Sequence, residues 1–203
     1  MDQLTYRVIL AVILIGFVIH RAYYTRKVQH SNESVIEQPK PGLVEQIANL
    51  LSIPALLATL INVVQPQWMS WSALPFPAWL RWLGVGIALT GFALLQWAQQ
   101  ALGNNWSDEI KLVAGQQVVI QGPYRWVRHP IYAAFLLILG SLLLISANWF
   151  IGGLWLALTA VDVSARIRTE EAMLLNRFGE RYRSYMQRTG RLLPRIAKRR
   201  RTV

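Results

Sequence analysis

The sequence of 203 residues contains no cysteine. This absence excludes disulfide bonds, thiolate catalysis, cysteine-ligated zinc and a prenyl or palmitoyl anchor on this chain. Histidine is nearly absent too, and the spacing of His20, His30 and His129 gives little support to a zinc or di-iron site. The isolated glycines do not form the fingerprint of a nucleotide-binding loop. We therefore expect no metal.

Acidic residues are scarce: 10 Asp and Glu stand against 21 Lys and Arg, a formal net charge of +11. In a soluble protein this charge would suggest a nucleic-acid partner. Here the basic residues flank long apolar segments, and no nucleic-acid-binding module accompanies them. With 54% hydrophobic residues and nine Trp, the chain reads as a membrane protein whose basic edges contact anionic lipid headgroups. We expect membrane lipids, not nucleic acid, as partners.

Five apolar segments approach the length needed to cross a bilayer. They are Leu4–Tyr24, Leu43–Val64, Trp79–Leu102, Pro130–Ala147 and Trp149–Ala165. The last two are short and lie on either side of residues 146–148, which predicts a helical hairpin. The first lacks the basic start and cleavage site of a signal peptide, so we expect a retained helix, with Arg7 and His20 reaching toward the headgroups. Gly84, Gly86 and Gly91 are predicted close-packing positions.

The predicted fold is therefore an all-α integral membrane protein with about five transmembrane helices. A loop, predicted as a folded lid, covers residues 103–129, and an amphipathic helix follows from Arg166. The expected organisation is one membrane domain, 1–203, with three N-terminal spans in 1–101, a cofactor-binding loop, hairpin and C-terminal helix in 102–196, and a basic tail in 197–203. Basic residues in the first and third loops and at the C-terminus predict an outside N-terminus and a cytoplasmic C-terminus, in a prokaryotic inner membrane.

The densest special chemistry lies in residues 122–132. Gly122-Pro123 is a turn signal, and Pro130 suits the first position of a helix, where a missing N–H costs nothing. Arg128 and His129 would then stand at a helix N-terminus, where free N–H groups and the dipole favour anions. Two interpretations are equally open: a ligand site, or basic residues that anchor a membrane helix at the headgroups.

A second constellation follows the last apolar segment. Helical spacing puts Asp162, Arg166 and Glu170 on one face. On spacing alone, a structural salt-bridged ladder is favoured over a ligand site. In the functional alternative, Arg166 clamps an acidic substrate and Glu170 binds a polar or cationic group of a soluble ligand.

Together these motifs resemble a known family. Gly122-Pro123-Tyr124, Arg128-His129-Pro130-Ile131-Tyr132, a hairpin, Arg166 to Glu170-Glu171, Phe178-Gly179-Glu180-Arg181-Tyr182 and Leu193-Pro194 closely resemble the isoprenylcysteine carboxyl methyltransferase family. The resemblance runs from about residue 102 to 194, and the wider superfamily includes phospholipid N-methyltransferases. The first two spans carry no matching motif.

The resemblance implies an S-adenosylmethionine-dependent methyltransferase that acts at the cytoplasmic membrane face on a lipid-like or prenylated small-molecule acceptor, with carboxyl methylation expected. Arg166 and Glu170 would be catalytic, with Arg166 facing the acceptor. The implied cofactor-binding residues are Gln116, Gln117, Val118, Val119, Tyr124, His129, Pro130, Ile131, Tyr132 and Glu170. Relatives have His followed by Thr-Leu-Val where this chain has Gln116 to Val119.

Other readings stay open. A carboxylate nucleophile needs no general base, whereas an amine would need one, for which Glu170, Glu171 or Tyr132 are candidates. Membrane sterol reductases, which bind NADPH, look similar at their C-terminal end. A non-catalytic membrane protein would use the same charges only as anchors. The sequence fixes neither the acceptor nor the oligomeric state.

Overall fold

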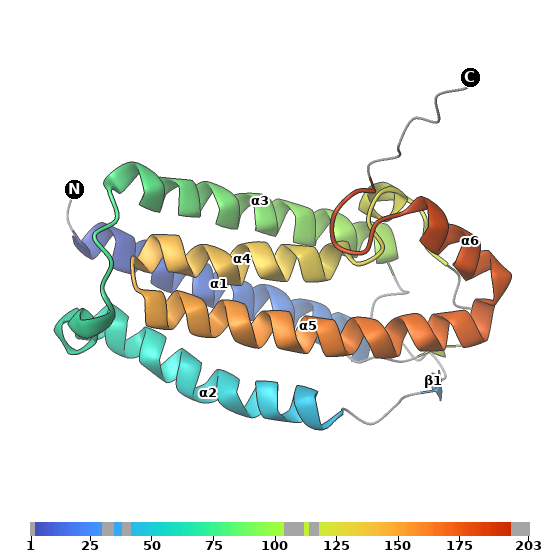
Figure 1. The fold of residues 1–203 in the computed structure, drawn as a ribbon, viewed down its shortest axis with the longest axis horizontal. Helices are drawn as coiled ribbons and strands as arrows, with labels where there is room; N and C mark the ends of the chain where they lie inside the picture. Colours follow the sequence, from blue (N-terminus) through green and yellow to red (C-terminus); the bar gives the residue numbers. More distant parts are fainter. Residues whose placement is uncertain (1–2, 30–34, 38–41, 104–111, 114–117, 196–203) are drawn as a thin grey trace, which may run out of the picture.

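The protein is described here from a computed structural model, which covers residues 3–29, 35–37, 42–103, 112–113 and 118–195. The chain folds as a bundle of long helices with a small polar region at one end (Figure 1). The helices are α1 (Gln3–Gln29), α2 (Leu43–Val64), α3 (Ala78–Leu102), α4 (Pro130–Ser146), α5 (Trp149–Phe178) and α6 (Glu180–Arg188). Two short 3-10 helices, η1 (Pro66–Ser72) and η3 (Gly122–Arg125), join them, and β1 (Val35–Glu37) pairs antiparallel with β2 (Leu112–Val113).

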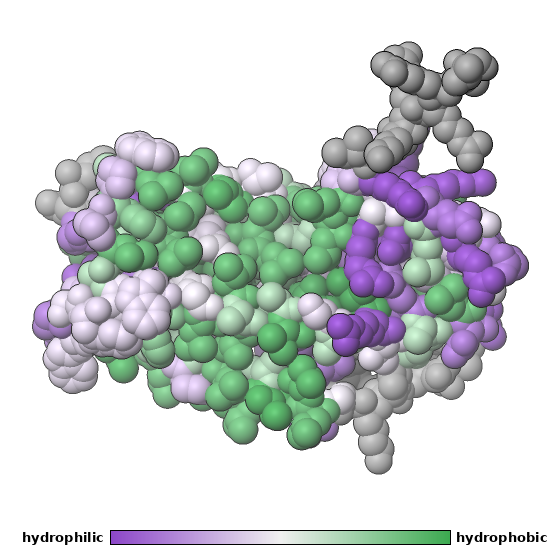
Figure 2. All heavy atoms as spheres, in the orientation of Figure 1, coloured by the Kyte–Doolittle hydropathy of each residue, from purple (hydrophilic) through white to green (hydrophobic). Residues whose placement is uncertain are grey.

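Four of the described helices, α1, α2, α3 and α5, are long and apolar enough to cross a membrane, and α4 is a shorter apolar helix. α4 packs against α1, α3 and α5, so it lies inside the bundle. Large apolar side chains point outward along the bundle, such as Val12 and Leu50, which are 62% and 66% exposed. Figure 2 shows the resulting apolar band, with hydrophilic residues gathered at the end that carries α6. The predicted all-α membrane fold is confirmed.

The predicted hairpin between α4 and α5 is present, and Asn148 builds its turn. Ala147 adopts a left-handed conformation with φ 49°, and Asn148 caps α5 by accepting a hydrogen bond from the Ile151 N–H at 3.0 Å. The Asn148 amide also donates to Ser72 Oγ at 2.8 Å and to Met69 O. This buried residue therefore fixes the hairpin turn and ties η1 to it.

Two of the three glycines predicted to allow close helix packing do so. A Cβ on Gly84 would lie 2.7 Å from Leu144 Cβ, and one on Gly91 would lie 2.7 Å from Ile138 Cγ1. The prediction for Gly86 is wrong, because a Cβ there meets nothing within 4 Å. α3 and α4 therefore approach closely at these two glycines, which lie two turns apart on α3, as small residues permit in lipid.

The predicted span ends at Ala165, but the helix that contains it continues, joined directly to the predicted amphipathic helix that starts at Arg166. α5 runs without a break through Arg166 to Phe178 and ends at Gly179, whose φ of 53° suits a glycine. The side chains change from apolar to charged near Arg166, which alters the surroundings of the helix. No helix-breaking residue occurs there, so the helix continues. Only α6 is a separate C-terminal helix. Of the predicted lid, residues 104–111 and 114–117 lie outside the described residues, so the lid stays a prediction.

Arg7 and His20, which the sequence suggests can reach toward the headgroups, both have partners on neighbouring helices. Arg7 Nε and Nη2 donate to the carbonyl oxygens of Val63 and Val64, at 2.5 and 3.0 Å. These carbonyls belong to the last turn of α2, where no intrahelical donor remains. His20 turns inward, with Nε2 3.1 Å from Gln96 Oε1 on α3. Neighbouring helices thus supply partners for Arg7 and for one nitrogen of His20, whose Nδ1 has none among the described residues.

Candidate functional site

The segment that leads into α4 is bound to the C-terminal segment by backbone hydrogen bonds. The Arg128 N–H donates to Gly190 O at 2.8 Å, and the Gly190 N–H donates back to Trp126 O at 3.1 Å. The His129 N–H donates to Arg191 O at 3.1 Å. Two segments about sixty residues apart in the sequence therefore form one unit at the polar end of the bundle, where Figure 1 shows them side by side.

Glu171 on α5 is the centre of the charged cluster in this unit. Its Oε1 accepts from Arg128 Nε at 2.9 Å and lies 3.2 Å from His129 Nε2. Its Oε2 accepts from Arg191 Nη2 at 2.6 Å. Arg128 also donates to Thr189 O at 2.6 Å. A buried carboxylate with three donors is satisfied internally, so Arg128 holds the fold together at this helix N-terminus.

His129 lies between two carboxylates. Its Nδ1 is 3.4 Å from Glu170 Oε2, while its Nε2 faces Glu171, and the residue is only 4% exposed. Burial by itself lowers the pKa of His129, but the hydrogen bond to Glu171 and the charges of both glutamates outweigh it and raise the pKa above its ordinary 6.5. The imidazolium form, with both nitrogens donating, is therefore favoured.

Glu170 differs from its neighbour in how well it is satisfied. Its Oε2 is buried, yet within the described part of the chain it accepts no hydrogen bond, and His129 Nδ1 lies 3.4 Å away. Tyr132 lies beside it: the ring stacks on His129 at 5.7 Å with planes 24° apart, and the phenol is within electrostatic range of Glu170 and Arg166. The buried Glu170 oxygen beside the His129 ring has no hydrogen-bond donor among the described residues, so it can accept a donor from a ligand.

Two tyrosines, Tyr124 and Tyr185, lie next to the charged cluster around Glu171 and connect η3 with α6. Tyr185 on α6 donates its hydroxyl to Tyr124 O at 2.6 Å. Burial raises the pKa of Tyr185 to about 12, and it also raises the pKa of Tyr124, so both remain neutral phenols at physiological pH. Tyr124 is buried in the core, where it fixes η3 against the bundle.

Arg166 takes a structural partner one turn earlier on its own helix. Its Nε lies 3.0 Å from both carboxylate oxygens of Asp162. The first half of the predicted ladder is therefore present. The second half is not, because Glu170 faces His129 on another element.

The sequence-predicted site residues thus separate into groups. His129, Tyr132 and Glu170 come together, with Pro130 as the first residue of α4 beneath them. Ile131, Val119 and Tyr124 pack into the apolar core, and Val118 is half-buried. Gln116 and Gln117 lie outside the described residues.

Sequence reasoning missed the role of Glu171 and the participation of Arg191. The consecutive pair Glu170-Glu171 was a usable signal, since adjacent helical residues point in different directions and one of the two could serve the fold. Arg191 lies beyond α6 in a stretch without periodicity, so nothing local indicated its partner. Glu45, at the start of α2, is 6% exposed and electrostatically coupled to Arg166 and Asp162, a contact that depends on the packing of α2 on α5.

Comparison with known proteins identifies this region. Residues 83–176 match the model of the isoprenylcysteine carboxyl methyltransferase (ICMT) family. These residues belong to the ICMT family. The matched segment contains α4 and the charged part of α5, so it includes His129, Tyr132, Arg166 and both glutamates. The family resemblance inferred from the motifs is therefore confirmed.

Relatives of the ICMT segment carry several names. The chain is 33% identical over 94 residues to the uncharacterized protein YpbQ of Bacillus subtilis, covering 46% of this chain and 56% of YpbQ. It is 30% identical over 119 residues to the protein-S-isoprenylcysteine O-methyltransferase of Tribolium castaneum, covering 57% and 42% of the two chains. It is 35% identical over 71 residues to methanethiol S-methyltransferase 1 of Bradyrhizobium diazoefficiens, covering 35% and 24%. The matches thus span about half or less of each relative's length.

A solved structure shares the fold. The eukaryotic intramembrane Ras methyltransferase ICMT superposes with a TM-score of 0.55 at 21% sequence identity, covering 77% of this chain and 54% of the other. At this identity the likeness concerns the fold. It extends the similarity beyond the matched family segment to most of the helical bundle.

Proposed function

We propose that the protein is a membrane methyltransferase that uses S-adenosylmethionine and methylates an amphipathic, lipid-like acceptor at the polar end of the bundle. The observation that carries the proposal is the placement of His129 between Glu170 and Glu171, inside the segment shared with the ICMT family. Relatives named as methyltransferases of isoprenylcysteine and of methanethiol support the reaction class.

The residues present fit this cofactor. S-adenosylmethionine supplies a methyl group on a cationic sulfonium and also carries an ammonium and a carboxylate. Glu170 Oε2 is a buried acceptor without a hydrogen-bond donor among the described residues, so it suits a cationic or N–H group. His129 and Tyr132 would hold the polar part of the cofactor from the N-terminus of α4. Val118 and Val119 would contact its apolar surface.

The chain's own contribution would be positioning and exclusion of water. Methyl transfer is an in-line displacement, whose rate depends on alignment of the two reacting atoms. Glu171 keeps His129 in place through the network with Arg128 and Arg191, so the cofactor-binding side chains are preorganised by the fold. The apolar surroundings of α4 would keep water away from the reaction.

The first test is isothermal titration of the detergent-purified protein with S-adenosylhomocysteine. Micromolar binding is expected, and Glu170→Gln and His129→Ala should weaken it at least tenfold. Glu180→Gln is the matched control, since Glu180 lies on α6 in an exposed pair with Arg183 and should leave binding unchanged. A folded protein that binds NADPH and not S-adenosylhomocysteine would refute the proposal and favour a reductase. Binding of neither would point to a non-catalytic membrane protein.

A further inference from the structure

Arg166, which the family resemblance assigns to the acceptor, already has a carboxylate partner in this chain. Its Nε lies 3.0 Å from both oxygens of Asp162, one turn earlier on α5. Both side chains are mostly buried, so water and salt screen the pair only weakly. An acceptor carboxylate would have to displace Asp162 or share the guanidinium with it, and sharing would bring two like charges together.

A second carboxylate, Glu45, lies near the pair on α2, a helix outside the matched family segment. Trp155 Nε1 on α5 donates to Thr59 Oγ1 on α2 at 3.0 Å, and the two helices run antiparallel (Figure 1). With equal rise along both helices, Glu45 is level with about residue 169 of α5, about one turn from Arg166. Glu45 is buried, and it is electrostatically coupled to both members of the pair.

The charge around Arg166 is therefore not positive. Within the described part of the chain, the groups that act most strongly on Arg166 are Asp162, Glu45 and the Tyr132 phenol, none of which is a cation. Two carboxylates and one guanidinium sum to −1, and the sum is zero when Glu45 is protonated. An anionic acceptor group gains no net attraction here, yet it loses its hydration on entering a buried site.

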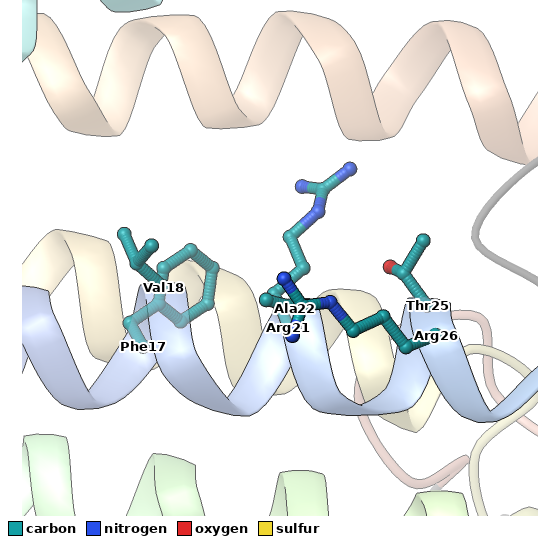
Figure 3. Close-up of a pocket in the computed structure, with 6 residues that line it drawn as sticks. All are labelled: Phe17, Val18, Arg21, Ala22, Thr25 and Arg26. Atoms are coloured by element: carbon teal, nitrogen blue, oxygen red, sulfur yellow. The ribbon is translucent and has the colours of Figure 1, made fainter.

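The basic side chains of α1 do not supply the missing positive charge. Arg21 and Arg26 line an open pocket along that helix, and the Arg21 side chain extends toward α5 (Figure 3). The Arg21 guanidinium carbon lies 5.9 Å from the centroid of the Phe135 ring. Neither arginine is among the charges that act on Glu45 or most strongly on Arg166.

Tyr132 connects this acidic group with the candidate cofactor-binding residues. Its phenol is within electrostatic range of Arg166 and Asp162. Its ring stacks on His129, whose Nδ1 faces Glu170. The acidic group therefore lies beside the place where an acceptor has to meet the cofactor. Ionised carboxylates only accept hydrogen bonds, so this place suits an acceptor group that donates them.

We propose that Asp162 is a specificity-determining residue, which occupies Arg166 and so favours an acceptor that presents an amine over one that presents a carboxylate. This inference rests on the proposed methyltransferase function and names the acceptor class of the same site. It departs from the carboxyl methylation that the family resemblance implies. An ammonium group must lose a proton before its nitrogen can act as a nucleophile, and a carboxylate of this group can accept that proton and release it to water.

The test compares two probes that differ only in their polar group. Dodecylamine and dodecanoate have chains of equal length, and their binding to the purified protein is measured in a neutral detergent with S-adenosylhomocysteine present. We expect at least tenfold tighter binding of dodecylamine, after correction for the partition of each probe into protein-free micelles. Comparison of variants in one detergent cancels that partition altogether.

Substitutions assign the preference to the charges around the guanidinium. Asp162→Asn removes the carboxylate from Arg166 and should raise the affinity for dodecanoate at least tenfold. A further Arg166→Gln substitution in the same protein should abolish this gain. Glu45→Gln should shift the preference toward dodecanoate at least threefold, and it covers the case in which Asp162→Asn does not fold. Glu180→Gln, in an exposed pair on α6, is the control and should keep the wild-type preference.

Three results would overturn the inference. They are equal or tighter binding of dodecanoate by the wild type, a folded Asp162→Asn protein without a gain for dodecanoate, and a gain that survives the loss of Arg166. If the wild type binds neither probe, the gain or its absence in Asp162→Asn decides. S-adenosylhomocysteine is titrated on the same samples, so a failure of the acceptor preference with retained cofactor binding is separable from a failure of the proposed function.

Discussion

Asp162 holds Arg166 through a single guanidinium nitrogen, because Nε of Arg166 lies 3.0 Å from both carboxylate oxygens of Asp162. Both side chains are mostly buried, with 13% and 24% of their surface exposed. The pair stands where the bundle changes from apolar to polar surroundings. Its first role is to neutralise a cation inside α5.

Asp162→Asn should therefore destabilise the protein by about 1.5–3 kcal/mol, the usual contribution of a hydrogen bond to a charged group. The measurement is thermal or denaturant unfolding in detergent. Glu180→Gln removes an exposed pair on α6 and should change stability by no more than about 1 kcal/mol. Equal effects of the two substitutions would contradict a structural role for Asp162.

Glu170 and Glu171 should behave differently although they are adjacent. Glu171→Gln removes the charge that Arg128, His129 and Arg191 share, so a large loss of stability is expected, about 3–5 kcal/mol for a broken buried pair. Glu170→Gln should leave the melting temperature nearly unchanged and reduce the affinity for S-adenosylhomocysteine. Titration and melting on both variants check the division. A Glu170→Gln protein that unfolds as readily as Glu171→Gln would disprove it.

The raised pKa of His129 predicts a pH dependence of stability. The hydrogen bond to Glu171 and the charges of both glutamates outweigh burial and favour the imidazolium in the folded protein. A folded-state pKa above the unfolded one means that the stabilisation is complete below pH 6.5 and is lost as the pH rises through the folded value. The difference in melting temperature between wild type and His129→Gln should therefore shrink across that window. A difference that grows with pH would show the opposite sign and refute the assignment.

Gly152 and Gly153 form a matched pair for helix packing. A Cβ on Gly152 would lie 2.2 Å from Leu143 Cα, a backbone atom of α4 that cannot move aside cheaply. Gly152→Ala should cost about 1–3 kcal/mol or prevent folding of the hairpin, as overpacking does. Gly153→Ala meets nothing within 4 Å and should be tolerated. Comparison of detergent melting curves and of folded yield tests this, and similar behaviour of the two variants would argue against close α4–α5 contact.

The helices were predictable where apolar length and local signals agree. The predicted segment Leu43–Val64 is α2 itself, and Pro130 begins α4 because proline at the first helical position lacks only an N–H that would have no partner. The sequence predicts a span up to Ala165 and a second helix from Arg166, because the composition changes there, whereas the structure has one helix that breaks only at Gly179, where a positive φ is required.

Side-chain contacts were predictable only where both residues lie on one face of the same helix. The Asp162–Arg166 pair follows from the spacing of four residues. The contact of Glu170 with His129, the Arg191–Glu171 pair and the contact of Arg7 with α2 depend on the relative register of separate elements. A single sequence contains no measure of that register. The sequence therefore indicates which residues belong to the site but not which of them contact each other.

The unbroken length of α5 sets how deep the site lies in the bilayer. From the Asn148 cap to Glu170 the helix advances by about 33 Å at about 1.5 Å per residue, close to the roughly 30 Å of a hydrocarbon core. Because α5 is one continuous helix, the depth of its hairpin turn in the membrane determines the depth of Glu170 and Glu171 at its other end. Lipids with longer or shorter acyl chains would shift Glu170 relative to the water interface. Membrane thickness would then govern how easily a water-soluble cofactor and a lipid-soluble acceptor meet at the same height.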